Sequence, residues 1–576
     1  MTEYPRPQFK REAWLPLDGN WSFSFSETLT PKDVAWTHEI TVPFPPESKL
    51  SGIHDESFHP VVWYKRSLEV PEAWDGRRLR LHFGAVDYRA RVWVNGQFVA
   101  LHEGGHTPFW ADITDALNAH VNEIVVCAED DPHDLAKPRG KQDWLSEPHG
   151  IWYPRTTGIW QSVWLEPLSE LHLESLRLTP SVTDLSVRLE AEVGGAEPGD
   201  KLLVTLAHEG KTLVEDSFSL NGLAVTRTLF LDDPGIDDAR NAFLWSPETP
   251  TLLPLTLKLV RGDKVLDVVE SYTALRQVEA RRGQFFLNSR PYFMRLALDQ
   301  GYWDDGLLSA PDDDALRKDV ELAKAMGFNG VRKHQKIENP RYLFWADRLG
   351  LLVWEELPSA YAFTKDTAPR LTREWLEVVN RDYNHPCIVV WMAFNESWGV
   401  PELPASAPQR DLVAALYHLT KALDPSRLVI GNDGWEHVVS DLHTIHDYDG
   451  DPEVLRERYG TADASAASSA QIRPAGRDIV LTGYDLGDAP VILSEFGGIR
   501  YAEGGEGWGY SQVECPEDLL TNYRAVIAAA SEAGLAGFCY TQFADTFQEQ
   551  NGLLFSDRTP KVALEKLFAA TFQRKR

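Results

Sequence analysis

The sequence predicts a multidomain protein in which two all-β regions precede a C-terminal (β/α)8 TIM barrel. Three observations predict this class. The chain has 576 residues, too many for one core, and its length suggests roughly three or four domains. Up to about residue 281, apolar and polar residues alternate in short runs that end in turn-forming residues. After about residue 282, short buried strands alternate with amphipathic helices.

The first region, residues 1–168, is expected to form an antiparallel β domain. Residues 78–83 alternate polar and apolar side chains, and residues 90–99 show a strand, an Asn-Gly turn and a second strand. A long loop follows at 131–158, and loops of that length are usually functional or disordered. Its aromatic content favours an ordered loop. The aromatic residues in or next to it are Trp144, Trp152, Tyr153 and Trp160.

The second region, residues 169–281, is expected to be a small β-sandwich. Short alternating strands are predicted at 171–178, 185–193 and 203–207, with Gly, Pro and Asp between them. This interpretation depends on the pattern alone, because the region has no cysteine pair around a tryptophan.

The third region, residues 282–576, is expected to form the barrel. It contains eight strand candidates, at 292–298, 327–332, 351–356, 388–394, 427–432, 441–447, 490–495 and 535–541. Helical patterns separate several of them, at 313–326, 371–384 and 517–534. A β–α alternation of this length fits a (β/α)8 barrel of about 250 residues with insertions.

Two glutamates stand where catalytic groups of such a barrel belong. Glu396 follows the apolar run that begins at Ile388, and Glu495 ends the run that begins at Val491. A single glutamate at a strand end usually just enters solvent. Two of them, with Asn395 directly before Glu396, instead indicate the paired carboxylates of a glycosidase.

Bulk composition excludes some functions. The net charge of -29 argues against nucleic acid or an anionic membrane as a partner, since both require basic patches. Four cysteines without a CxxC pair predict free thiols in a reducing compartment. The N-terminus shows no apolar targeting segment, so a cytoplasmic protein is expected. No metal motif appears and no cofactor is expected; a homo-oligomer is compatible with the sequence.

Three segments resemble glycoside hydrolase family 2, the family of β-galactosidases, β-glucuronidases and β-mannosidases. Residues 83–96 resemble its sugar-binding jelly-roll signature, 157–166 the segment that closes that domain, and 384–399 its acid/base signature. The resemblance implies a jelly-roll domain at 1–168, an immunoglobulin-like sandwich at 169–281 and a catalytic barrel at 282–576.

The resemblance also implies a retaining mechanism with Glu396 as acid/base and Glu495 as nucleophile. The two carboxyl groups should then lie about 5–5.5 Å apart. Glu396 should have a pKa raised by burial or by repulsion from Glu495, whereas Glu495 should stay ionised. Asn395 would hydrogen-bond the sugar 2-hydroxyl.

Further residues at the strand ends are expected to bind substrate. They are Asp299 and Gln300, Arg332 and His334, Asp433 and Trp435, His446 and Tyr448, Tyr540 and Gln542, with Trp508 as a sugar platform. The Asp299-Gln300 pair departs from the Asn-Arg-His that many family members carry there. His334 could instead be a satisfied core histidine, and Glu356 could line the site or pair with Arg332. The loop with Asp143 could reach the barrel mouth or pack on its own domain.

The expected reaction is the exo-removal of a terminal neutral sugar from a small glycoside or oligosaccharide. β-Glucuronidases of this family carry a lysine for the uronate where this chain has Gln548-Glu-Gln-Asn-Gly-Leu-Leu-Phe, so a neutral sugar is favoured. A β-D-galactosidase comes first. Alternatives are a β-D-galactofuranosidase or α-L-arabinofuranosidase, a β-glucuronidase, a β-mannosidase, a transglycosylase and an inactive carbohydrate-binding protein.

Overall fold

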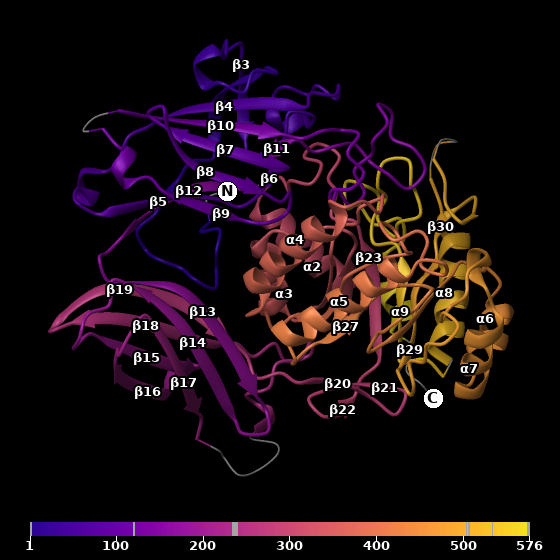
Figure 1. The fold of residues 1–576 in the computed structure, drawn as a ribbon. Helices are drawn as coiled ribbons and strands as arrows, with labels where there is room; N and C mark the ends of the chain where they lie inside the picture. Colours follow the sequence, from indigo (N-terminus) through magenta and orange to yellow (C-terminus); the bar gives the residue numbers. More distant parts are fainter. Residues whose placement is uncertain are drawn as a thin grey trace.

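The computed structural model describes residues 3–118, 121–232, 240–502, 504, 507–532 and 534–572. Its first unit is a sandwich of two antiparallel sheets (Figure 1). One sheet has the order β3 (His38–Val42), β2 (Gly19–Phe25), β4 (Val61–Leu68), β10 (Asn122–Glu129), β7 (Arg89–Val94) and β8 (Gln97–Glu103). The other has the order β1 (Leu15–Pro16), β12 (Val163–Leu168), β5 (Arg78–Phe83) and β9 (Phe109–Asp112). Two bridging strands, β6 (Val86–Asp87) and β11 (Gly158–Ile159), pair with each other.

The predicted Asn-Gly hairpin is confirmed between β7 and β8. Asn95 and Gly96 have φ angles of 51° and 78°. Two successive left-handed residues match the right-handed twist of the strands that they join, and Asn and Gly tolerate this conformation best.

The second unit is a seven-stranded sandwich. Its sheets have the orders β13 (His172–Ser181), β14 (Ser186–Gly194), β17 (Ala224–Phe230), and β16 (Lys211–Ser219), β15 (Lys201–His208), β18 (Leu253–Arg261), β19 (Lys264–Thr273). Leucine and valine side chains from both sheets form its core. This unit contacts the barrel through Asp347, whose main chain accepts from Trp245 Nε1 at 2.7 Å and whose side chain accepts from Tyr272 at 2.7 Å.

The C-terminal unit is a barrel of eight parallel strands, each of which overlaps a predicted one. Their order is β27 (Leu428–Ile430), β26 (Ile388–Met392), β25 (Leu352–Glu356), β24 (Gly330–Lys333), β23 (Met294–Asp299), β32 (Gly537–Thr541), β29 (Val491–Gly497) and β28 (His443–Asp447). The predicted fold class is therefore confirmed. A small hairpin of β20 (Val278–Arg281), β21 (Gln284–Leu287) and β22 (Arg290–Pro291) precedes the barrel, and short β30 (Ile499–Arg500) pairs with β31 (Ser511–Gln512).

Helices surround the strands (Figure 1). They are α2 (Asp313–Ala325), α3 (Pro340–Leu349), α4 (Thr367–Asp382), α5 (Ala407–Leu423), α6 (Pro452–Tyr459), α7 (Ala462–Gln471), α8 (Pro516–Glu532) and α9 (Leu564–Thr571). Across the residues that the structure describes, every helix falls short of the length and apolarity that crossing a bilayer requires. The four cysteines are free, as predicted.

Two features of this fold position the site. Among the described residues, the sheet ladder is open between β27 and β28, so polar groups fill this seam instead of strand pairing. In addition, the long loop of the first unit docks on the barrel. Both Arg139 and Gly140 donate main-chain hydrogen bonds to the carbonyl of Ser359 at 3.1 Å, and Tyr361 donates to the carbonyl of Gly140 at 2.7 Å. The loop is ordered by these contacts and does not pack on its own domain alone.

Candidate active site

Glu396 leaves strand β26 in a constrained backbone conformation. Its φ is 53° and that of Ser397 is 59°, a left-handed region that non-glycine residues rarely adopt. The main-chain N–H of Glu396 donates to the carbonyl of Asp433 at 3.0 Å, and Ser397 N–H donates to Asn432 Oδ1 at 3.0 Å. The loop after β27 thus holds a turn that costs backbone energy, which is common where a side chain must be aimed.

The two predicted catalytic carboxylates converge. One carboxylate oxygen of Glu396, one of Glu495 and one ring nitrogen of His446 all lie within 4.8 Å of one another. Glu495 comes from β29 and His446 from β28, two strands that pair in parallel. The carboxyl ends of these strands and of β26 meet at one face of the barrel, so residues about 100 positions apart in sequence share one site.

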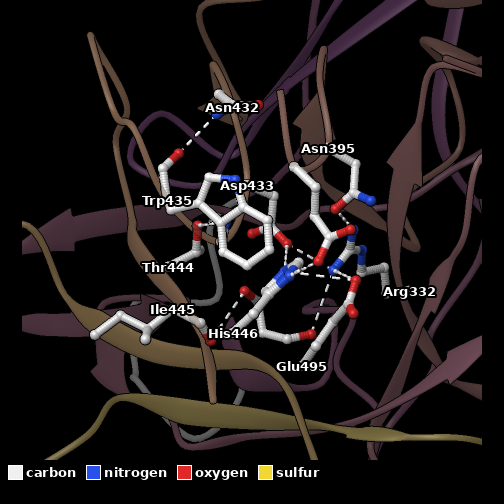
Figure 2. A network of polar contacts seen from close by, with 12 residues as sticks. Arg332, Asn395, Asn432, Asp433, Trp435, Thr444, Ile445, His446 and Glu495 are labelled. Atoms are coloured by element: carbon white, nitrogen blue, oxygen red, sulfur yellow. Dashed lines mark hydrogen bonds and ion pairs between the residues drawn. The ribbon is translucent and has the colours of Figure 1, made fainter. Parts of the chain in front are cut away.

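Arg332, at the end of β24, organises the floor of the site. Its Nη1 donates to Asp433 Oδ2 at 2.6 Å and to Glu495 Oε1 at 3.1 Å, and its Nη2 donates to Asn395 Oδ1 at 2.8 Å. Its Nε donates to Glu356 Oε2 at 2.8 Å. Figure 2 shows the guanidinium beside Glu495 and Asn395. A buried guanidinium with these partners keeps Glu495 close to a permanent positive charge.

His446, at the end of β28, lies between the carboxylates of Glu396, Asp433 and Glu495. Nδ1 lies 2.8 Å from Glu396 Oε1, and Nε2 lies 2.5 Å from Asp433 Oδ2 and 3.5 Å from Glu495 Oε1. Burial lowers the pKa of His446, but the charges of Glu495 and Asp433 and the hydrogen bonds to Asp433 and Glu396 outweigh burial and raise it to about 10. The ring is therefore an imidazolium at neutral pH.

The expected rise in the Glu396 pKa is wrong for this arrangement. Burial raises the pKa, but the hydrogen bond and the charge of His446 lower it to about 2. Repulsion between two glutamates cannot dominate when an imidazolium lies between them. In this structure the proton of the acid/base pair therefore resides on His446, and Glu396 is ionised. Trp398 Nε1 also donates to Glu396 Oε2, at 3.2 Å.

Tyr448 fixes the second oxygen of Glu495. Its hydroxyl donates to Glu495 Oε2 at 2.6 Å and lies 3.1 Å from Thr541 Oγ1. The Tyr448 ring stacks on Tyr510 with centroids 3.4 Å apart. A cavity of about 460 Å³ opens in front of these groups. It is lined by Glu396, Trp435, His446, Asp447, Tyr448, Asp449, Pro474, Ala475 and Tyr510.

Several buried polar atoms of the site have no hydrogen-bond partner among the described residues. They include the donors Asn395 Nδ2 and Trp435 Nε1 and the acceptors Gln300 Oε1, Glu356 Oε1 and Asp433 Oδ1. Trp435 also lies edge-to-face against His446, with centroids 5.4 Å apart. Buried polar groups are normally satisfied, so these atoms are candidates for contacts with substrate hydroxyls.

Other predicted substrate residues take part in protein contacts. Gln300 Nε2 donates to Gln542 Oε1 at 3.1 Å, which places both amides in one buried network. His334 Nδ1 lies 3.1 Å from Glu356 Oε2, so Glu356 joins the site and pairs with Arg332 at once.

The structure places four predicted residues away from the pocket. Asp299 accepts from Lys333 at 2.8 Å, and Asp143 accepts from its own loop at His149. Tyr540 packs edge-on against Tyr523 of α8, because Thr541, the next residue of the strand, faces inward toward Tyr448. Trp508 lies at the rim, where its Nε1 donates to the carbonyl of Gly150 at 2.9 Å.

Three residues near the site were missed by sequence reasoning: Lys141, Trp398 and Glu549. Lys141 belongs to the docked loop, and Glu549 lies in the excursion after β32, where it accepts from Tyr153 at 2.5 Å. The signal in the sequence for Lys141 is a charged residue in a loop that is otherwise rich in aromatic side chains.

A metal ion does not fit the Glu396, His446 and Glu495 cluster while His446 is protonated. Both ring nitrogens of His446 already contact carboxylates, and the raised pKa keeps them protonated. A protonated imidazole has no lone pair for a metal.

Comparisons with known proteins agree along the chain. Family models described as "Glycosyl hydrolases family 2, sugar binding domain", "Glycosyl hydrolases family 2" and "Glycosyl hydrolases family 2, TIM barrel domain" match residues 40–165, 171–276 and 278–571. A β-galactosidase of Thermoanaerobacter pseudethanolicus is 29% identical over 60% of this chain, and that match spans 46% of the relative. A dog β-glucuronidase is 26% identical, over 97% of this chain and 90% of its own length.

The chain spans less than half the length of two relatives, 46% of the Thermoanaerobacter β-galactosidase and 44% of a Formosa agariphila protein named "Putative beta-glucuronidase". Among solved structures, a β-galacturonidase of Eisenbergiella tayi superposes with a TM-score of 0.76 at 19% identity, with 99% of both chains covered. A Ruminococcus gnavus β-glucuronidase solved with D-glucuronic acid also gives 0.76, at 19% identity and the same coverage. At this identity the structural matches show the shared fold.

Proposed function

The chain belongs to glycosyl hydrolase family 2, and on this premise we propose that it is a retaining exo-glycosidase that removes a terminal neutral sugar. The observation that carries the proposal is the convergence of Glu396 and Glu495, with carboxylate oxygens within 4.8 Å of each other. Retaining glycosidases need a short separation, because the nucleophile attacks the anomeric carbon directly; inverting enzymes leave room for a water molecule.

In the first step, Glu495 attacks the anomeric carbon while the glycosidic oxygen receives a proton. Arg332 and Tyr448 each hold one oxygen of Glu495, at 3.1 and 2.6 Å, which orients the nucleophile. The glycosidic C–O bond breaks, its electron pair stays on the leaving oxygen, and a glycosyl ester forms on Glu495.

The proton for the leaving oxygen comes through the pair of Glu396 and His446. The imidazolium lies 2.8 Å from Glu396 Oε1, so a proton that moves along this hydrogen bond converts Glu396 into the acid. In the second step Glu396 removes a proton from water, the water oxygen bonds to the anomeric carbon, and Glu495 is released as the carboxylate.

A β-D-galactoside is our first choice of substrate. The segment 548–555 supplies no lysine for a sugar carboxylate, and Arg332 is already engaged by three carboxylates. The β-galactosidase among the matched relatives supports the choice. A uronide is the second candidate, because the two solved structures named above are a β-galacturonidase and a β-glucuronidase. Furanoside hydrolysis remains compatible with the Asp299-Gln300 departure.

The test is a release assay on nitrophenyl glycosides: β-galactopyranoside, β-galactofuranoside, β-glucuronide, β-mannoside and α-L-arabinofuranoside. We expect strong preference for the β-galactopyranoside and a first product of unchanged anomeric configuration by NMR. Preference for the glucuronide would replace the neutral-sugar assignment, and an inverted first product would contradict the mechanism.

A further inference from the structure

The docked loop of the first sandwich carries Lys141 to the barrel mouth. The purple loop lies over the top of the barrel in Figure 1. Gly140, directly before Lys141, has φ of +60°, and a Cβ atom there would lie 2.3 Å from the carbonyl oxygen of Gln335, just after β24. Only glycine allows this approach. The main chain is therefore pinned next to the strands that carry Arg332 and Glu356.

Lys141 is buried without a counter-ion. Its exposed fraction is 5%, and in the described ranges its ammonium group has neither a hydrogen-bond acceptor nor a carboxylate oxygen within 4.0 Å. The neighbouring buried lysines behave differently, because Lys333 pairs with Asp299 at 2.8 Å and Lys336 pairs with Glu338 at 3.0 Å. The ammonium nitrogen of Lys141 is not among the enclosed polar atoms that lack a partner, so it reaches solvent and is available to an acceptor that the protein itself does not supply.

The electrostatics show which way the charge faces. Burial has the largest influence on the pKa values of Glu396, Glu356, Glu549 and His334, and the positive charge of Lys141 then lowers all four. These groups come from three strand ends and from the excursion after β32. Lys141 therefore faces the space that they enclose.

Glu549, in the excursion after β32, is held by hydrogen bonds at both carboxylate oxygens. Oε2 accepts from Tyr153 at 2.5 Å, and Oε1 accepts from Asn551 at 3.2 Å. Asn551 in turn accepts from Gln542 at 2.7 Å, so the network that contains Gln300 supports Glu549. Each oxygen of Glu549 holds one donor and retains capacity for another.

We propose that Lys141 and Glu549 form a donor–acceptor pair that binds hydroxyl groups of the neutral terminal sugar and thereby determines specificity. The inference rests on the proposed function and names two residues that select its substrate. Tyr153 links the two residues, because its main-chain N–H donates to the carbonyl of Lys141 at 2.8 Å and its hydroxyl donates to Glu549 at 2.5 Å, while no ion pair within 4.0 Å joins the two charged groups in the described ranges. A sugar hydroxyl can accept from the ammonium and donate to the carboxylate at once.

A sugar carboxylate fits this place less well. Three acids, Glu396, Glu356 and Glu549, already share the charge of Lys141. A uronate would add a fourth negative group around one ammonium, whereas hydroxyl groups add no charge.

The test compares full-length Lys141→Met and Glu549→Gln with the wild type, on the preferred glycoside and on its monodeoxy analogues. Lys141→Met should lower kcat/KM about 10- to 100-fold on the parent sugar, and much less on the analogue that lacks the contacted hydroxyl. The double variant should lose less than the product of the two single losses. Lys32→Met, at an exposed lysine of the same sandwich, serves as the matched control and should match the wild type.

Stability separates binding from a structural role. Because Lys141 makes no direct hydrogen bond or ion pair with its ammonium group among the described residues, Lys141→Met should change the melting temperature little. A lower melting temperature with unchanged selectivity among the deoxy sugars would overturn the proposal. So would a loss confined to the β-glucuronide, which would make Lys141 a carboxylate ligand. If the wild type cleaves glycosides and Glu495→Gln does not, a Lys141→Met variant with wild-type rates on the parent sugar and on every deoxy analogue refutes only this inference. A wild type that is inert on the whole panel refutes the proposed function.

Discussion

Glu495 and Glu396 stand at the ends of two strands of the same barrel, yet they are held in opposite ways. Glu495 lies within β29 opposite His446 of β28, next to a register shift, is 6% exposed at its side chain, and contacts the permanent cation Arg332. Glu396 lies on a left-handed turn beside the open seam, is 15% exposed at its side chain, and contacts His446, whose charge depends on pH.

The difference matches two chemical demands. A nucleophile must be aimed at the anomeric carbon throughout the cycle, and hydrogen bonds from a buried guanidinium and a tyrosine hydroxyl hold Glu495 in place. An acid/base group must gain and lose a proton in each cycle, so it needs a titratable neighbour and access to water. His446, at the end of β28, is that neighbour, and the 15% exposure of the Glu396 side chain gives its carboxylate access to solvent.

The largest effect is expected at the nucleophile. Glu495→Gln removes the attacking carboxylate, so kcat on the preferred nitrophenyl glycoside should fall by several orders of magnitude. A more activated leaving group should not restore it, because bond formation at the anomeric carbon is lost. Residual activity near the wild-type rate would remove Glu495 from the mechanism and break the comparison.

A smaller loss that depends on the leaving group is expected at Glu396. Glu396→Ala should lower kcat about 10²–10⁴-fold for a sugar leaving group, but much less for a dinitrophenolate, which needs no proton. Azide should then increase turnover and yield a glycosyl azide of unchanged configuration. An equal loss for every leaving group would show that Glu396 is not the acid.

His446 should determine where kcat/KM falls on the alkaline side of its pH profile. In the wild type the proton is held with a pKa of about 10, so kcat/KM should persist well above neutral pH. In His446→Gln the alkaline fall of kcat/KM should move to lower pH.

The free energy of unfolding should depend on the protonation of His446 as well. The stabilisation that the protonated His446 ring contributes is complete below the ordinary histidine pKa of 6.5, and it is lost as the pH rises through the raised pKa of about 10. Urea denaturation at pH 7 and pH 10 should therefore show a larger drop for the wild type than for His446→Gln. Parallel profiles would contradict the assignment.

The smallest effect in this series is expected at Tyr448. Tyr448→Phe removes one 2.6 Å hydrogen bond to Glu495 and leaves the Arg332 contact, so kcat should fall about 10- to 100-fold. The stacked Tyr510 ring offers a control, because Tyr510→Phe keeps the stacking and should change kcat by less than about threefold. Equal losses in both variants would assign the effect to packing.

The sequence predicts the fold and both glutamates because their signals are local. Each glutamate ends an apolar run that only a buried parallel strand explains, and parallel strands present their ends at one face. Tyr540 was expected in the pocket but faces away from it, because consecutive residues of a strand point to opposite faces. Here the side chain of Thr541 is the one that faces Tyr448.

Other properties of the site arise only in three dimensions. The pKa of Glu396 depends on His446, which lies 50 residues away in sequence, so burial alone predicts the wrong direction. Lys141 reaches the barrel through contacts with Gln335 and Ser359, about 200 residues further along the chain. Loop patterns carry no signal for such a partner.

Covalent trapping of Glu495 tests the central claim most directly. The protein would be incubated with a dinitrophenyl 2-deoxy-2-fluoro-β-galactoside, a sugar whose fluorine slows release of the glycosyl ester, and then analysed by intact mass and peptide mapping. We predict one added sugar per chain, attached to Glu495, and no adduct in Glu495→Gln. An adduct on another carboxylate, or inversion of configuration without any adduct, would contradict the account.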